Sequence, residues 1–74
     1  MGTQNTHIAK TNYVKKMLEK SKENEKGYPR NYIEANMVIL FHCTKKTAKE
    51  IVQAFIDAKM ATEEDTNGEV LLFG

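Results

Sequence analysis

A link of three residues, 42–44, separates two segments in which apolar side chains recur every three or four positions. This spacing lines one side of a helix, so the sequence predicts one helix over 32–41 and another over 44–59. A link this short forces consecutive helices into contact at a steep angle, which is the arrangement of a helix-turn-helix. Cys43 is the small apolar residue expected to fill the turn.

The helix predicted after the link has the clearest amphipathic pattern. Its apolar stripe consists of Ala48, Ile51, Val52 and Phe55, and Ala58 and the stem of Lys59 are expected to extend it. Thr44 can cap the first turn by accepting a hydrogen bond from it, and Thr47 with Glu50 offers a second start three residues later. The opposite face is polar and carries Lys46, Lys49, Glu50, Gln53 and Asp57, flanked by Lys45 and Thr47.

A first helix is expected to begin at His7 or Asn12 and to run to about Lys26, where Gly27 is a stop signal. Its inner stripe comprises Val14, Met17 and Leu18, with Tyr13 beside them and Ile8 a turn or two earlier. After Gly27, Pro29 leaves room for only a very short strand or a turn.

In the helix over 32–41, Asn31 is the predicted N-cap, and Glu34 completes a capping box with it. Its main face is Ile33, Met37, Leu40 and Phe41, and three further apolar residues lie outside that face. A helix that is apolar on most sides is expected to be buried by several neighbours, so this segment is predicted to be the central helix.

The last 15 residues of the chain predict a β-hairpin. Residues 60–64 are a candidate strand, and residues 65–69 contain Asn67-Gly68, which is the strongest short-range hairpin signal. Residues 70–73 are apolar and suited to a return strand.

Length, cysteine count and charge limit the class of protein. The 74 residues are enough for one small domain over 1–74, with 1–6 expected to be disordered. The single cysteine excludes an internal disulfide and fits a reducing, cytoplasmic setting, and no run of about 18 apolar residues predicts a membrane span. The net charge of +1 is unevenly distributed, because residues 1–30 hold seven basic and three acidic side chains while residues 61–74 hold four acids and no base.

From Tyr32 to Phe73 the sequence resembles the winged helix-turn-helix family. The stretch FHCTKKTAKEIVQAFIDAKMA is similar to the family's order of an apolar residue, a turn, a Ser/Thr cap, a recognition helix and a short exit into the wing. The matching positions are Phe41, Cys43, Thr44, Ala48 and Ile51. The resemblance is greatest to small transcriptional regulators of archaea, bacteria and their viruses or plasmids. It implies an α+β fold of three helices followed by a C-terminal β-hairpin.

In that family the third helix enters the major groove of double-stranded DNA. The resemblance therefore implies a sequence-specific or general DNA-binding protein, a transcriptional regulator that uses helix 44–59 in the groove. A homodimer is expected on a separate ground, because the core of so short a chain is thin and pairing would supplement it. The implied groove contacts are Lys46, Lys49 and Gln53, and the implied phosphate contacts are Lys45 and Thr47, with Lys15, Lys16 and Arg30 as further basic contacts. No cofactor and no small-molecule ligand is expected.

Two features depart from the family pattern. His42 stands where many members have Gly, at a turn that is expected to need a left-handed backbone. The wing is acidic where family wings often carry Arg or Lys, and its acids are Glu63, Glu64, Asp65 and Glu69. The alternative function is therefore a winged-helix protein–protein interaction module or a subunit of a larger complex. In that case the hairpin and the apolar side chains of Ile56, Leu71 and Phe73 would face the partner.

Catalysis and metal binding are not expected from this sequence. His7, His42 and Cys43 are the strong soft-metal ligands of the chain, and a structural zinc site needs four ligands. His42 and Cys43 are adjacent in sequence, and consecutive residues rarely bring their side chains together as a nucleophile and its base.

Overall fold

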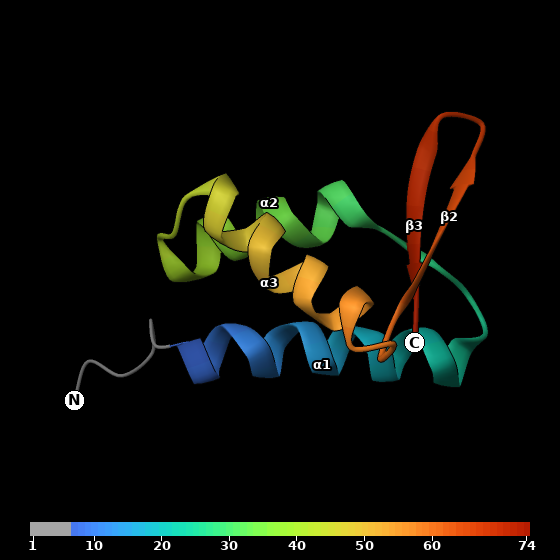
Figure 1. Cartoon of the computed structure of the whole chain (residues 1–74), viewed down its shortest axis with the longest axis horizontal. Coiled ribbons are helices and arrows are strands. Elements are labelled where there is room, and N and C mark those ends of the chain that lie inside the picture. The colour runs from blue at the N-terminus through green and yellow to red at the C-terminus, as the bar shows by residue number, and fades with distance from the viewer. Residues whose placement is uncertain (1–6) are drawn as a thin grey trace.

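A computed structural model describes residues 7–74 of the chain. The elements are α1 (His7–Asn24), β1 (Tyr28–Pro29), α2 (Arg30–Phe41), α3 (Lys45–Asp57), β2 (Thr62–Thr66) and β3 (Glu69–Phe73) (Figure 1). Three helices followed by an antiparallel hairpin make an α+β fold with the layout of a winged helix-turn-helix, as predicted. The prediction made for residues 1–6 lies outside the described residues.

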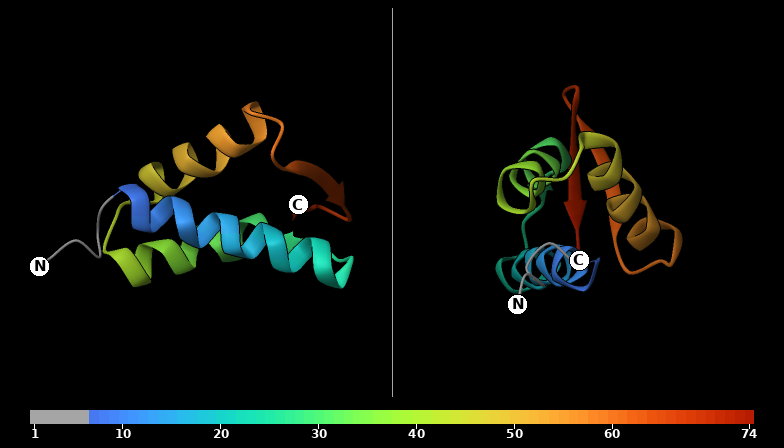
Figure 2. Two further views of the ribbon diagram at one scale, coloured as in Figure 1. Left: turned by 90° about the horizontal axis from the view of Figure 1, so that it is seen from below. Right: turned by 90° about the vertical axis from the view of Figure 1, so that its left-hand side faces the viewer.

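The core lies where the three helices and the inner strand meet. Seen end on, the helices surround a common interior and the hairpin stands behind them (Figure 2). The buried apolar residues are Val14, Leu18, Ile33, Met37, Ala48, Ile51, Val52, Phe55, Ala61 and Leu72. The four main residues of the apolar stripe predicted for α3 are therefore confirmed. Its predicted extension to Ala58 and Lys59 is wrong, because both residues follow the end of the helix at Asp57 and are exposed. In α1, Ile8 is 70% exposed and was wrongly included, because six residues of helix turn it well away from the side that buries Val14.

The sheet has the strand order β1-β3-β2, and both pairings are antiparallel. β1 is the very short strand allowed by the sequence, and it pairs Tyr28 with Leu72. Asn67 and Gly68 form the hairpin turn with φ of 52° and 82°. Positive φ at both positions defines the turn type that Asn-Gly favours.

The second strand begins two residues later than the sequence predicts, at Thr62 rather than Met60. The end of α3 explains the delay. Lys59 takes a φ of 64°, its backbone N–H donates to Ile56, and the N–H of Met60 donates to Phe55. The chain therefore completes the exit turn of the helix, which ends at Asp57, before it extends into the hairpin.

The turn between α2 and α3 follows the prediction closely. His42 adopts a left-handed backbone with φ of 54°, and the Thr44 side chain caps α3 by accepting from the N–H of Thr47 at 3.2 Å. Cys43 packs against the core, with its thiol 3.5 Å from the carbonyl oxygen of Met37.

Three predicted helix ends are wrong, and one of them is the end of α3, at Asp57 rather than Lys59. α1 stops at Asn24 because Glu25, rather than Gly27, takes the left-handed backbone, and the buried Ser21 hydroxyl donates to the carbonyl of Lys26. α2 begins directly after Pro29 with no side-chain cap, so Asn31 is a first-turn residue and no capping box forms. Pro29 favours this early start because its ring presets the backbone for a helix entry.

Several elements pack against α2, as predicted for the central helix: α1, α3, β1 and β3. The prediction that they bury most of its sides is wrong. One side, with Ile33 and Met37, is fully buried, but Tyr32, Ile39 and Leu40 are 54%, 69% and 55% exposed. The other elements pack mainly on the first side, and α1 reaches the second side only near Asn36, through Tyr13.

No helix within residues 7–74 is both long enough and apolar enough to cross a membrane.

Candidate nucleic-acid interface

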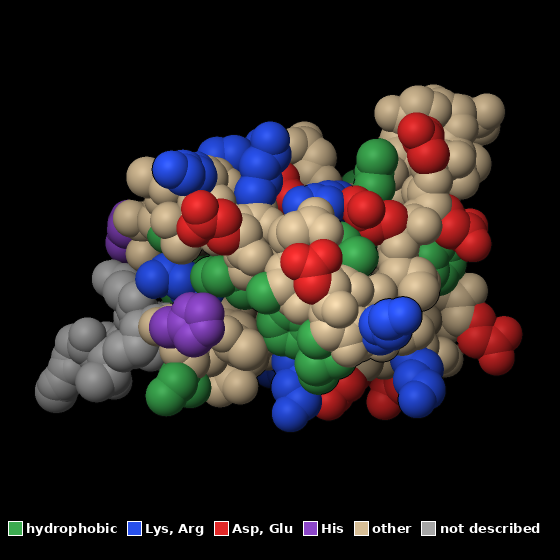
Figure 3. Space-filling view, viewed as in Figure 1, with side chains coloured by type: hydrophobic (Ala, Val, Ile, Leu, Met, Phe, Trp, Pro, Cys, Tyr) green, Lys and Arg blue, Asp and Glu red, His purple; other side chains and the backbone are tan. Residues whose placement is uncertain are grey.

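Two lysines occupy the exposed face of α3. Lys46 and Lys49 lie on the side of the helix opposite the buried Ile51 and Val52, and both are exposed. Neither ammonium group makes an ion pair or hydrogen bond with another part of residues 7–74. Figure 3 shows several basic side chains and an acidic one over the beginning of α3, and acidic ones over the hairpin. This end of α3 is thus an uncovered cationic surface.

The other predicted contacts on α3 are partly engaged within the protein. The Lys45 ammonium donates to the Asn31 side chain at 2.9 Å, which ties the start of α3 to the start of α2. The Thr47 hydroxyl lies 3.1 Å from the Thr44 hydroxyl and is half-buried, so it belongs to the helix cap.

Gln53 is held along the surface of α3 by two hydrogen bonds. Its amide nitrogen donates to Asp57 at 3.0 Å, and its amide oxygen accepts from Arg30 at 3.3 Å. Both ends of the amide are therefore oriented before any ligand is present. A base contact from Gln53 would require these exposed bonds to be exchanged.

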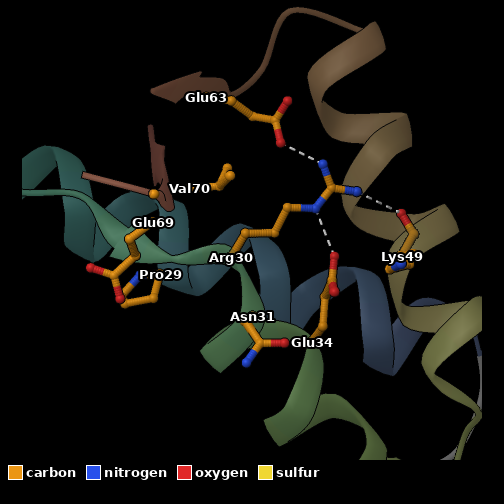
Figure 4. A pocket seen from close by; sticks show the side chains of 9 residues that line it. Pro29, Arg30, Asn31, Glu34, Lys49, Glu63, Glu69 and Val70 are labelled. Atoms are coloured by element: carbon orange, nitrogen blue, oxygen red, sulfur yellow. Dashed lines mark hydrogen bonds and ion pairs between the residues drawn. The ribbon is translucent and has the colours of Figure 1, made fainter. Parts of the chain in front are cut away.

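Arg30 connects α2, α3 and the hairpin (Figure 4). Its guanidinium pairs with Glu34 at 2.6 Å and with Glu63 of β2 at 2.5 Å. It also donates to the backbone carbonyl of Lys49 at 3.5 Å. Arg30 was predicted as a DNA contact, and the structure places its charge among these internal partners.

The local electrostatics favour the charged form of Arg30. Burial of the guanidinium works against its charge, but the hydrogen bonds that it donates to Glu34 and Glu63 outweigh this and raise the pKa of Arg30 above its ordinary value. The Glu34 side chain is 4% exposed, so its carboxylate depends on Arg30 for compensation of its charge.

A groove of about 690 Å³ lies beside this ion pair, between the hairpin and the starts of α2 and α3. Its charged lining residues are Arg30, Glu34, Lys49, Glu63 and Glu69. Three carboxylates against two cations give the groove a net negative charge, so it does not extend the cationic surface of α3 toward the wing. Glu64, Asp65 and Glu69 are exposed on the hairpin itself.

The two predicted lysines of α1 lie apart from the cationic end of α3. Lys15 and Lys16 are both exposed. Lys15 lines a hollow with Phe55 and Met60, which are at the C-terminal end of α3. The structure therefore brings Lys46, Lys49 and Gln53 onto one face and leaves Lys15 near the opposite end of the same helix.

Two features of the surface were not identified from the sequence. The first is the ion pair of Arg30 with Glu34, although their spacing of four residues on a helix is a usable signal. The second is the exposed apolar side of α2. The expected partner-facing residues Ile56, Leu71 and Phe73 are instead half-buried around the core.

No group of three or more His, Cys, Asp and Glu side chains is arranged to hold a metal ion within residues 7–74. In comparisons with known proteins, the chain matches no family profile, no curated sequence and no solved structure. The fold and the surface define a class: a small α+β domain of winged-helix layout with an exposed lysine-bearing third helix. Its function is inferred from that geometry.

Proposed function

We propose that this chain binds double-stranded DNA with α3 in the major groove and acts as a transcriptional regulator, paired with a second copy, in the cytoplasm. One observation carries the proposal: the face of α3 that bears Lys46 and Lys49 is uncovered and its two ammonium groups are unpaired within the described residues. An α-helix fits the major groove, and free lysines can contact phosphates or base edges there.

The contacts differ in how readily they can be made. Lys46 and Lys49 are available at once, whereas Lys45 and Gln53 would have to exchange an internal hydrogen bond. The acids of the hairpin would be repelled by phosphates, so we propose that the wing stands away from the duplex. Arg30 then acts within the protein, by neutralising Glu63 and holding the hairpin beside α3.

The salt dependence of binding tests the proposal. We expect affinity for a short duplex of mixed sequence, measured by fluorescence anisotropy, to fall steeply between about 50 and 200 mM salt. Substitution of Lys46→Ala with Lys49→Ala should lower the affinity at every salt concentration. It should also reduce the slope of log affinity against log salt by about two, since each phosphate contact contributes roughly one.

A matched pair of lysines provides the control. Lys20→Ala with Lys22→Ala removes the same charge from α1, and the salt slope should change much less. Equal losses from the two pairs would show diffuse attraction rather than a site on α3. Wild-type affinity that does not respond to salt, or tighter binding to single-stranded DNA, would overturn the proposal.

The second candidate is a protein–protein interaction module or a subunit of a larger complex. The exposed and uncharged side of α2 favours this function, because large apolar side chains gather there outside the core. Co-purification of an unlike protein with no nucleic acid, together with a failed DNA titration, would favour it.

A further inference from the structure

One face of α2 is exposed and carries no charge. Tyr32, Ile39 and Leu40 are each more than half exposed, and Ala35 and Asn36 lie partly exposed between them. We call these five residues the α2 stripe. The charged residues of α2 are Arg30 and Glu34, and both are turned to the other side, toward α3 and the hairpin. In a sequence that is 28% charged, a whole helix face without a charge is unusual.

The α2 stripe has large side chains at its ends and smaller ones between. Tyr32 and Ile39 are seven residues apart, which is two turns or about 10 Å along the helix axis. Ala35 and Asn36 lie at the middle, and Asn36 is near enough to Tyr13 of α1 to affect the pKa of its phenol. This spacing is the one by which a helix packs against another helix.

We infer that the α2 stripe is the surface through which two copies of this chain pair, with their α2 helices antiparallel across a two-fold axis. This inference gives a surface to the homodimer included in the proposed function, but it rests on α2 and not on DNA binding. In such a pair, Tyr32 of one copy lies opposite Ile39 and Leu40 of the other. The smaller residues meet at the axis and let the helices approach closely.

Charge favours the α2 stripe over α1 and the hairpin as the face that a second copy would cover. A two-fold axis places a surface against itself, so any surface with a net charge meets its own charge. The lysine-rich outer side of α1 and the acidic hairpin would both repel their own copies, whereas the α2 stripe brings no charges together. Antiparallel α2 helices also place the positive end of each helix dipole beside the negative end of the other.

The surface area of the α2 stripe limits the expected affinity of the dimer. A stable interface buries about 800 Å² on each partner, and a single helix face of 12 residues offers less than that. We therefore expect a dimer with a dissociation constant on the order of 10 μM, visible as a change of mass with concentration.

Analytical ultracentrifugation of the full chain, without DNA, tests the inference. Between about 1 and 500 μM, the wild type should change from monomer to dimer. Ile39→Glu should weaken pairing at least tenfold, since it places a carboxylate inside an apolar seam. Ile8→Glu is the matched control, because Ile8 is 70% exposed on α1 against 69% for Ile39, and it should pair like the wild type. Circular dichroism on both variants checks that the fold is kept.

A mixing experiment tests the antiparallel arrangement. Tyr32→Lys and Leu40→Glu should each pair weakly alone. Mixed together they should form a heterodimer at least tenfold tighter than either homodimer, because the new lysine then faces the new glutamate. A wild type that stays monomeric over the whole range would overturn the inference. So would equal pairing by the two isoleucine variants, or a mixture no tighter than its components. None of these results bears on the salt test of DNA binding, so the two proposals fail separately.

Discussion

The outer faces of α2 and α3 are both exposed, and they differ in every other respect. α3 buries one regular stripe and turns lysines, acids and an amide to solvent. α2 has apolar residues on both sides, and only the side with Ile33 and Met37 is covered. Exposed charge is stable without a partner, whereas exposed apolar area is stabilised when it is buried. We therefore propose different partners for the two faces: a polyanion for α3 and an apolar protein surface for α2.

The largest expected effect is a difference in the free energy of unfolding between substitutions on the two sides of α2. Met37 is fully buried and Ile39 is 69% exposed. We expect Met37→Ala to lower the free energy of unfolding by about 2–5 kcal/mol through lost burial and a cavity, and Ile39→Ala to change it by about 0.5 kcal/mol or less. Urea unfolding followed by circular dichroism, at low micromolar protein where pairing is absent, measures both.

The expected loss for Met37→Ala is large for a domain of this size, whose total stability lies near the low end of about 5–15 kcal/mol. Similar losses from Met37→Ala and Ile39→Ala would mean that the α2 stripe already contributes to the folded monomer. In that event the stripe would not be a free surface.

The next largest expected effect on stability concerns Arg30, which joins α2 to α3. Arg30→Met leaves the Glu34 carboxylate, 4% exposed, without its partner, and we expect a loss of about 3 kcal/mol in the free energy of unfolding. Adding Glu34→Leu should recover most of that loss, because no unpaired charge is then buried. Glu63→Gln should cost less than about 1 kcal/mol, since the Glu63 side chain is 34% exposed.

These three variants can be compared in one set of urea titrations. One contrary outcome is that Arg30→Met lowers the free energy of unfolding no more than Glu63→Gln does. The Arg30–Glu34 pair would then not be the main stabilising interaction of Arg30, and Arg30 would be free to act at the surface. A double variant less stable than Arg30→Met alone would show that Glu34 does not depend on Arg30.

The local parts of this fold could be predicted from the sequence because their causes are local. The apolar spacing was sufficient to predict α3, and the Thr44 hydroxyl was sufficient to predict its cap. Asn67-Gly68 was sufficient to predict the hairpin turn. The left-handed backbone of His42 was expected because many members of the winged helix-turn-helix family have Gly at this position. Each of these features depends on residues within a few positions of one another.

The parts that were missed depend on distant contacts. Which side of α2 is covered is decided by how α1, α3 and the hairpin pack, and an apolar pattern on both sides cannot say which. In the same way, Glu63 reaches Arg30 across 33 positions of sequence, so the hydrogen bond that links the hairpin to α2 had no local signal. The candidate site changed accordingly: Lys46 and Lys49 stay free, while Arg30 is placed inside the protein.

The smallest expected effect on stability concerns Tyr13 of α1, which lies near Asn36 at the edge of the α2 stripe. Burial raises the pKa of Tyr13 above its ordinary value of about 10, the hydrogen bond with Asn36 partly offsets this, and the nearby Tyr32 adds to the rise. Because the folded state favours the neutral phenol, its contribution to stability is present below about pH 10 and is lost as the pH rises above it.

Tyr13→Phe isolates this contribution. We expect the variant to lose about 1 kcal/mol at neutral pH through the missing hydrogen bond, and to show a shallower fall in the free energy of unfolding above about pH 10 than the wild type. Urea unfolding at a series of alkaline pH values gives the difference in free energy of unfolding between the variant and the wild type. The titration of the lysines is common to both proteins and cancels in this difference. Parallel alkaline curves would show that Tyr13 ionises as easily in the folded chain as in the unfolded one. The contact between α1 and the α2 stripe would then be open to water, and Asn36 would lie fully on the uncovered side of α2.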